Sequence, residues 1–469
     1  MKIPLVVAPV GLAISFALPA FAQQKKNRPL VSRTASKLAC WVRSMMRKTL
    51  AIINRQQVWT VAGVLLLAVG LQLDAQQADL DAAAAAKAAA VREALSRAPG
   101  AVQGPVGTFI TFDFPGAIYG TTPVSMNPAG AITGYYTDPN LPALSHGFLR
   151  ASDGTFTTFD VPGAVYGTEP FGINNGGFIT GSYGDNIGSG SHGFLRAPNG
   201  TFATFDAPGD AFTVTVPYSI NPAGTITGSY FDAHYVAHGF LRATNGTLTT
   251  FDAPGAGPPP GIPLKGTLAV GINPEGAIVG MSTDANNVDH GFLRARDGTF
   301  TTFDPPGAIA TFSPYFPGLA ENLYITPDGV ITGTYRELIS GNPDGGNYRV
   351  FVRTRDGTFT TFDAATYPAP VWSFPSGITP AGAITGSFRD GFIYYHGFVR
   401  ARNGTVTTFD VPGAGTRANQ GTVPLGINPG GVIMGLYIDE INVPHGFLLL
   451  LRSKHHDRSD RSLGDTSDE

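Results

Sequence analysis

The sequence predicts an all-β protein, a seven-bladed β-propeller of four-stranded antiparallel blades closed by the N-terminal strand. Three observations support this fold: one phrase recurs along the chain, each copy contains four short β-type runs, and the repeated region begins and ends on complementary fragments of the phrase. The composition agrees, because 60 glycines and 37 prolines in 469 residues disfavour long helices, while 43% hydrophobic residues are enough for a packed core.

Two landmarks mark the recurring phrase. The dipeptide Phe-Asp, preceded by Thr, occurs seven times at intervals of 46 to 59 residues, with its phenylalanines at Phe112, Phe159, Phe205, Phe251, Phe303, Phe362 and Phe409. The tripeptide His-Gly-Phe occurs six times, and residues 348–351, Tyr-Arg-Val-Phe, occupy the slot of the fifth copy. A repeat of this length with no helix between copies is typical of a propeller blade.

Each copy alternates strand-like runs with tight turns. In the fourth copy the runs are LAVGIN, AIVGMSTD, HGFLRA and TFTTFD, at residues 268–273, 277–284, 290–295 and 299–304. Turn residues join the first run to the second and the third to the fourth, and the second of these turns contains Asp-Gly or Asn-Gly in most copies. These dipeptides favour hairpins because they tolerate positive φ, so each copy predicts one four-stranded antiparallel unit.

The two ends of the repeated region complement each other. Residues 107–113, GTFITFD, form a lone fourth run, and residues 445–450, HGFLLL, form a lone third run. Pairing these two runs completes the seventh blade and removes the exposed sheet edges of an open ring. A β-solenoid is the alternative fold, but its coils are usually shorter and do not need complementary ends.

The segments outside the repeat indicate export. Residues 1–24 have the basic start, apolar run and Ala-x-Ala site of a signal peptide, and residues 46–77 repeat this logic as a second signal peptide or a membrane anchor. We interpret residues 1–24 as lying upstream of a true start near Met46. Residues 78–100 predict an Ala-rich helical linker, and residues 451–469 a disordered charged tail. Whether residues 46–77 are a signal peptide or a membrane anchor, we expect residues 105–450 to lie outside the cytoplasmic membrane: secreted, periplasmic or on the cell surface.

The charge distribution limits the class of partner. Residues 1–100 carry 13 Lys and Arg against four Asp and Glu, whereas residues 101–450 carry 14 against 25. An acidic body with Lys265 as its single lysine is unsuited to nucleic acid, because phosphate contacts need clustered cations. Cys40 is the single cysteine and lies outside the repeats, which excludes disulfides and thiolate metal sites there. We expect the protein to contact a membrane only through an N-terminal anchor. We also expect it to be a monomer.

The motifs HGFLR, GINPxG and IxG resemble those of the HAF-repeat family of bacterial extracellular proteins, over roughly residues 105–450. This sequence differs in having glycine where the family name has alanine, and one slot lacks the triplet altogether. The resemblance implies an exported repeat protein, and it supplies no catalytic residues.

The recurrent histidines and acids predict a structural role. Buried polar groups need partners, and WD-repeat blades are held together by a similar set of a histidine and an aspartate, so we expect His-to-acid hydrogen bonds in each blade. The histidines are His146, His192, His238, His290, His396 and His445, and the acids ending the second run are Asp138, Asp185, Asp232, Asp284, Glu337, Asp390 and Asp439. The aspartate of each Phe-Asp is expected to cap the following Pro-Gly turn. We predict no catalytic residue, metal ligand or cofactor in this set.

The loops predict where a ligand binds. In a four-stranded meander, the connections between strands 1 and 2 and between strands 3 and 4 lie on one face, here called the tight-turn face. The connections 2–3 and 4–1 lie on the opposite, variable face, and they contain the large length differences. Aromatic residues of the fifth and sixth blades, Tyr315, Phe316, Tyr367 and Trp372, are the predicted ligand-binding residues. The acids also gather on this face, which would favour cations, calcium included.

These features favour a non-catalytic binding or scaffold protein whose ligand is an extracellular or cell-surface glycan or a protein. The alternative is a propeller-fold polysaccharide hydrolase or lyase with its site in the loops of blades 4–6. An enzyme needs polar residues that break the repeat and converge. Lys265, Glu321, Glu337 and Asp344 break the repeat, but their spacing does not bring them together.

Overall fold

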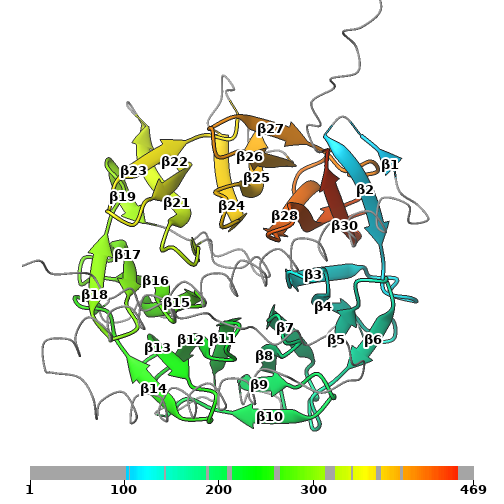
Figure 1. Cartoon of the computed structure of the whole chain (residues 1–469), viewed down its shortest axis with the longest axis horizontal. Coiled ribbons are helices and arrows are strands. Elements are labelled where there is room, and N and C mark those ends of the chain that lie inside the picture. The colour runs from blue at the N-terminus through cyan, green and yellow to red at the C-terminus, as the bar shows by residue number, and fades with distance from the viewer. Residues whose placement is uncertain are drawn as a thin grey trace, which may run out of the picture. The chain divides into compact units, whose positions relative to one another are not determined.

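The computed structural model describes residues 102–452, except for residues 105, 142–143, 186–189, 209–213, 258–264, 312–322, 340–341, 366–370 and 391–393 (Figure 1). The segments predicted at residues 1–24, 46–77 and 78–100, and the tail from residue 453 onward, lie outside the described residues. The described part is built of antiparallel sheets set around a common axis like the blades of a propeller. The all-β class and the repeated blade-like sheets are therefore confirmed.

Consecutive strands form units that correspond to the repeats of the sequence. Unit 1 contains β3 (Thr121–Met126), β4 (Ile132–Thr137), β5 (Ser145–Arg150) and β6 (Phe156–Phe159). Unit 2 contains β7 (Thr168–Ile173), β8 (Ile179–Tyr183), β9 (His192–Arg196) and β10 (Phe202–Phe205). Unit 3 contains β11 (Thr215–Ile220), β12 (Ile226–Phe231), β13 (Val236–Arg242) and β14 (Leu248–Phe251). Unit 4 contains β15 (Lys265–Ile272), β16 (Ile278–Thr283), β17 (Asp289–Arg294) and β18 (Phe300–Phe303).

The later units follow the same order with two departures. Unit 5 contains β20 (Leu323–Ile325), β21 (Ile331–Ile339), β22 (Asn342–Arg353) and β23 (Phe359–Phe362). A further strand, β19 (Ala308–Thr311), also pairs with β21. Unit 6 contains β24 (Val371–Ile378), β25 (Ile384–Asp390), β26 (Tyr395–Arg400) and β27 (Val406–Phe409). Unit 7 joins β28 (Gly421–Ile427), β29 (Val432–Ile438) and β30 (Pro444–Leu451) to β2 (Gly107–Phe112).

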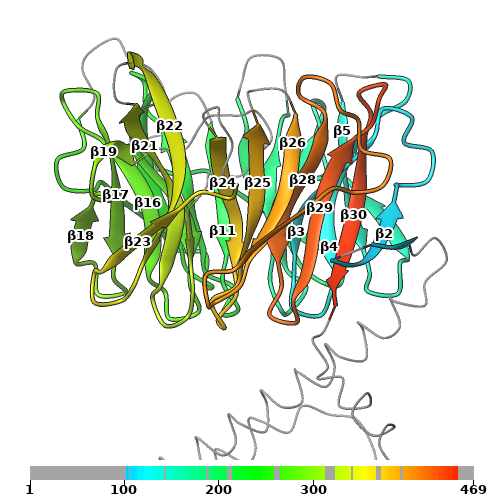
Figure 2. The ribbon, with the colours of Figure 1, turned by 90° about the horizontal axis from the view of Figure 1, so that it is seen from above.

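The two ends of the described chain meet in unit 7. Strand β2 pairs antiparallel with β30, from Thr108 opposite Leu450 to Phe112 opposite Gly446, and the short β1 (Val102–Gln103) pairs with β2 on its other side. Beyond β30, the guanidinium of Arg452 donates to the Gly104 carbonyl at 3.1 Å. Strand β2 begins and β30 ends at the tight-turn face, which is the lower face in Figure 2.

Local sequence explains the shape of the innermost strands. Strand β7 shifts register between Pro170 and Gly172, and the equivalent strands of five other units shift at the same place. Proline cannot donate to the sheet, so a bulge at this position costs no hydrogen bond. The hairpin between strands 3 and 4 is set by Asp-Gly: the carboxylate of Asp153 accepts from the Thr155 N–H at 2.9 Å, and Gly154 has a φ of 93°.

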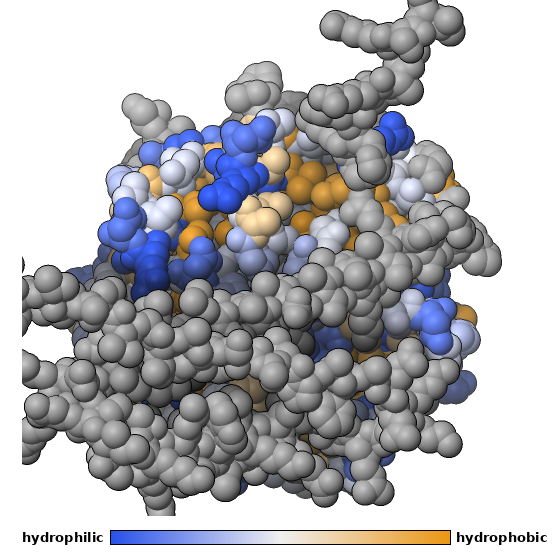
Figure 3. Space-filling view, in the orientation of Figure 1, coloured by the Kyte–Doolittle hydropathy of each residue, from blue (hydrophilic) through white to orange (hydrophobic). Residues whose placement is uncertain are grey.

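The core of each unit is built on the phenylalanine of His-Gly-Phe or its counterpart. These rings have no exposed surface, and each contributes about 1.5–3 kcal/mol by its burial; they are Phe148, Phe194, Phe240, Phe292, Phe351, Phe398 and Phe447. In the six His-Gly-Phe units, the glycine before the ring leaves room for the phenylalanine of Phe-Asp. A Cβ on Gly147 would lie 2.6 Å from the Phe159 ring. On the face shown in Figure 3, hydrophilic residues lie toward the outer edge and hydrophobic residues further in.

An asparagine on the innermost strand links one unit to the next. Its side-chain amide donates to the carbonyl of the equivalent residue in the following unit, in the pairs Asn127 to Asn174 (3.2 Å), Asn174 to Asn221 (3.1 Å), Asn221 to Asn273 (3.3 Å) and Asn273 to Thr326 (3.2 Å). The side-chain oxygen of the same residue accepts from the turn that follows it. In units 5 and 6 a threonine takes this place, and it has no side-chain amide to donate to the next unit. The bond to the turn is kept, because Thr379 Oγ1 accepts from the Ala383 N–H.

A second link joins the units near the tight-turn face. The arginine that ends the third strand lies over the phenylalanine of Phe-Asp in the preceding unit, with 4.6–5.2 Å between the guanidinium carbon and the ring centre. The pairs are Arg150 and Phe112, Arg196 and Phe159, Arg242 and Phe205, Arg294 and Phe251, Arg353 and Phe303, and Arg400 and Phe362. In unit 7 Leu449 occupies this position and packs in one cluster with Phe409.

Candidate functional site

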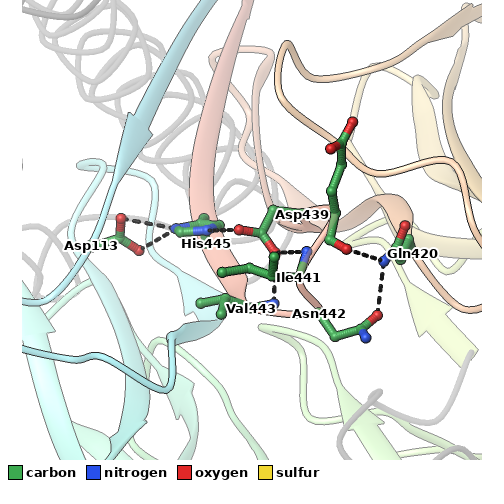
Figure 4. Close-up of polar contacts among 8 residues, drawn as sticks. Asp113, Gln420, Asp439, Ile441, Asn442, Val443 and His445 are labelled. Carbon is green, nitrogen blue, oxygen red and sulfur yellow. Dashed lines mark hydrogen bonds and ion pairs between the residues drawn. The ribbon is translucent and has the colours of Figure 1, made fainter.

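Each recurrent histidine lies near the variable face with one ring nitrogen bound to an aspartate. The Nδ1 atom contacts the carboxylate of the Phe-Asp motif at 2.8 to 3.0 Å, in the pairs His146 and Asp160, His192 and Asp206, His238 and Asp252, His290 and Asp304, His396 and Asp410, and His445 and Asp113. The last pair joins the two ends of the chain, because Asp113 follows β2 and His445 lies in β30 (Figure 4).

A second carboxylate faces the other ring nitrogen. The Nε2 atom lies 3.1 Å from Asp138 at His146, 3.2 Å from Asp185 at His192 and 3.3 Å from Asp439 at His445. The separation increases to 3.5 Å between His238 and Asp232 and to 3.7 Å between His290 and Asp284. For His396, the acid predicted at this place is Asp390, whose side chain lies outside the described residues.

The acid that ends the second strand also orders the loop after it. One carboxylate oxygen of Asp439 faces His445, while the other accepts from the backbone N–H groups of Ile441 (2.9 Å) and Val443 (2.8 Å), as Figure 4 shows. The carboxylates of Asp232 and Asp284 hold their loops in the same way. A single residue therefore fixes both the loop 2–3 and the histidine beside it.

The aspartate of Phe-Asp has a different partner from the predicted one. We expected it to cap the Pro-Gly turn, but its carboxylate accepts from histidine. A threonine at the start of the next unit serves the turn instead: Thr168 Oγ1 accepts from the Val161 N–H at 3.1 Å. A sequence signal for this bond exists in the spacing. The histidine and its aspartate are 14 residues apart in units 1, 2, 3, 4 and 6.

The fifth unit replaces histidine by arginine and keeps both acids. Arg349 Nε lies 3.0 Å from Asp363, again 14 residues away, and Arg349 Nη1 lies 3.1 Å from Glu337. A permanent cation takes the place of the imidazole between two carboxylates. The side chain at this position therefore has to donate a hydrogen bond to each of the two carboxylates, and an arginine can do this in place of a histidine.

The carboxylates bias the histidines toward the protonated state. The hydrogen bond to Asp113 raises the pKa of His445, with partial burial opposing it, and the bond to Asp252 does the same for His238. In return, the hydrogen bond to His146 lowers the pKa of Asp138. An imidazolium donates from both ring nitrogens, which matches the carboxylates that face it on both sides.

The predicted ligand-binding aromatics are not brought together by the described structure. Tyr315, Phe316 and Tyr367 lie outside the described residues, so their role stays a prediction. Trp372, in β24, is partly buried, and its ring centre lies 4.9 Å from that of Tyr348 at an interplanar angle of 85°. Trp372 thus packs edge to face against the neighbouring unit 5.

The residues that break the repeat are partly engaged in ion pairs. Lys265 Nζ lies 2.7 Å from a carboxylate oxygen of Asp289, which is 3% exposed and whose other oxygen accepts from Thr283 at 2.6 Å. Glu337 is bound to Arg349. The side chains of Glu321 and Asp344 lie outside the described residues.

Among residues 102–452 as described, no group of three or more His, Cys, Asp or Glu side chains is arranged to hold a metal ion. Asp232, His234 and His238 lie close together in the sequence, but the Asp232 carboxylate accepts from the backbone N–H of His234 at 2.8 Å. In the same part of the chain, no helix has the length and apolar character needed to cross a membrane.

No protein-family model matches the chain, and no curated protein matches it. Similar solved structures include a streptogramin B lyase, at 15% identity and a TM-score of 0.46 over 73% of this chain and 97% of that chain. The β-propeller domain of the Trilobed protease from Pyrococcus furiosus has 7% identity and a TM-score of 0.47 over 70% of this chain and 95% of its own. TolB from Acinetobacter baumannii has 14% identity and a TM-score of 0.38 over 60% and 63%. No family is assigned by these matches, and none of these proteins' activities is carried over to this chain.

Proposed function

We propose that this protein is an exported, non-catalytic binding or scaffold protein: a seven-bladed propeller, closed by its N-terminal strand, whose variable face binds an extracellular glycan or protein. The pairing of β2 with β30 supports the ring closure. The signal-like segments and the resemblance to HAF-repeat proteins support export to the periplasm, the cell surface or the medium. We also propose that it is monomeric and binds no nucleic acid.

The observation that carries the non-catalytic reading is the repetition of the histidine arrangement. Catalysis needs a singular set of groups with a free lone pair or a labile proton at one place. Here the same imidazole lies between carboxylates in unit after unit, and Arg349 substitutes for it in unit 5. Lys265 and Glu337, which break the repeat, are consumed in ion pairs.

The test is a thermal melt of the full-length protein with a panel of cell-surface polysaccharides, and with calcium. A ligand at about 100 times its Kd adds about 2.7 kcal/mol to the free energy of unfolding, which is visible as a rise in melting temperature. A rise with one glycan defines the ligand class. Cleavage of that glycan on incubation would replace the binding role by the hydrolase or lyase alternative, and a panel without any rise would leave a protein ligand.

A further inference from the structure

The exposed apolar side chains of the described structure gather on the variable face. Of the large hydrophobic residues that are exposed, only Val102 and Phe178 lie elsewhere. Six of the others belong to four neighbouring loops of units 7, 1 and 2, and we call them the apolar sector: Ile441 (77% exposed), Ile118 (62%), Leu141 (60%), Val165 (58%), Tyr119 (46%) and Tyr166 (42%). Exposed apolar residues that cluster in this way mark interaction sites.

The loops of the apolar sector are packed against one another. A Cβ on Gly120 would lie 2.5 Å from Pro444, so the loop of Ile118 and Tyr119 touches the end of the loop of Ile441. A Cβ on Gly167 would likewise lie 2.3 Å from the Ser145 hydroxyl, where the loop of Leu141 ends. These contacts join the loops in two pairs, and the pairs are linked because Phe114, in the loop of Ile118, stacks on Tyr136 just before the loop of Leu141, with 3.9 Å between the ring centres.

The framework beneath this surface is rigid. Asp439 and Asp138 fix the loops of Ile441 and Leu141 through bonds to their backbone N–H groups, and both acids also face a histidine. In units 1 and 2, Ile118-Tyr119 and Val165-Tyr166 occupy equivalent positions, each two residues before the threonine that caps the preceding turn. The sector thus presents two copies of one apolar pair, one unit apart, on loops that need little reordering to bind.

The charge of the sector is negative. Its loops, at residues 113–120, 138–141, 144, 160–167 and 439–443, contain the acids Asp113, Asp138, Asp160, Asp439 and Glu440 and no lysine or arginine. His146 and His445 each lie between two of these carboxylates, which still leaves three more acids than histidines. Arg417 lies on the adjoining loop before unit 7. A partner that covers the apolar side chains must therefore also approach carboxylates, which favours positively charged residues.

We propose that the apolar sector docks a segment of a partner protein in which Lys or Arg residues alternate with aliphatic ones. This rests on the proposed binding function and names the partner class. Four of the six side chains are aliphatic, and they offer neither a flat ring for a sugar to stack on nor a hydrogen bond for its hydroxyls. They match the apolar side chains of a peptide, while the carboxylates around them match its cations.

The test compares a variant of the sector with a matched variant of the opposite face. The triple variant Ile118→Ser, Val165→Ser, Ile441→Ser removes three of the exposed side chains, and Phe178→Ser removes an exposed side chain on the tight-turn face. The probe is a fluorescent peptide of Leu-Lys-Ser-Lys repeats, with a Ser-Lys-Ser-Lys and a Leu-Glu-Ser-Glu peptide as controls, measured by anisotropy on the full-length proteins. Unchanged melting temperatures would show that both variants fold.

We expect the Leu-Lys-Ser-Lys peptide to bind the wild type and Phe178→Ser equally, about tenfold or more weakly to the triple variant, and more weakly at high salt. Both control peptides should bind more weakly than the probe. Equal binding to all three proteins, or equal binding of the Ser-Lys-Ser-Lys peptide, would overturn the proposal. If a glycan found in the thermal melts binds and the triple variant loses it, the sector is a glycan site and the peptide proposal fails while the binding function stands.

Discussion

Replacing Asn174 by threonine should weaken one link between units while keeping the turn that this side chain organises. The buried Asn174 amide donates to the Asn221 carbonyl at 3.1 Å, and its oxygen accepts from the Gly176 and Phe178 N–H groups. The Asn221 carbonyl keeps a second bond, from Gly224 N–H at 2.9 Å. The loss is therefore that of one hydrogen bond without an orphaned partner, about 1 kcal/mol.

Two further variants separate the link from the turn. Asn174→Ala also loses the two turn bonds, whose donors are partly reached by water, so we expect a total cost of about 2–3 kcal/mol. Asn127→Thr removes the equivalent bond in unit 1, from the Asn127 amide to the Asn174 carbonyl at 3.2 Å, and should cost as much as Asn174→Thr. Urea unfolding followed by circular dichroism gives these free energies, with unchanged m-values. If Asn174→Thr is as stable as the wild type, or as unstable as Asn174→Ala, the reasoning is refuted.

Three other predictions concern the same framework. The stability should be greatest between pH 3.8 and 6.5. The raised pKa values of the histidines stabilise the fold below pH 6.5, and that gain is lost as the pH rises through the raised pKa values. The lowered pKa values of the acids stabilise the fold above pH 3.8, and that gain is lost on acidification. Urea midpoints that stay constant as the pH rises above 6.5 would contradict this prediction. Gly291→Ala should cost about 1–3 kcal/mol in urea unfolding, because its Cβ would lie 2.3 Å from the Phe303 ring, whereas Gly257→Ala, with open space around it, should cost far less. Lys265→Met should cost about 3 kcal/mol by leaving the buried Asp289 unpaired, and Asp289→Asn in addition should recover most of it; a double variant no better than the single one would show that the charge is not the cause.

The sequence predicted the units well because each is encoded by local signals repeated many times. Gly154 and its equivalents set the hairpins, and the phenylalanines of His-Gly-Phe mark the core. The pairing of β2 with β30 followed from the two incomplete phrases at the ends, since a third run without a fourth needs a partner. This long-range pairing could be predicted because the other repeats show what is missing at each end. A strand that occurs only once in a sequence gives no such comparison.

The site was less readable. The bond between each histidine and the Phe-Asp aspartate joins strand 3 to the end of strand 4, so predicting it requires the register of the hairpin. The constant spacing of 14 residues is the sequence feature that corresponds to this register. The apolar sector was not predicted, because the loops of Ile118 and Ile441 are far apart in sequence and are brought together by the pairing of β2 with β30.

The meeting of Gly104 and Arg452 has a consequence for how the chain folds. Unit 7 takes one strand from the start of the described residues, so it cannot be completed until β30 has been made, and its completion joins residues 348 apart in the sequence. A circular permutant that joins these adjacent ends and opens the chain in a tight turn between two units would build every blade from contiguous sequence. Such a permutant should keep the same native contacts and refold faster, because its relative contact order is lower.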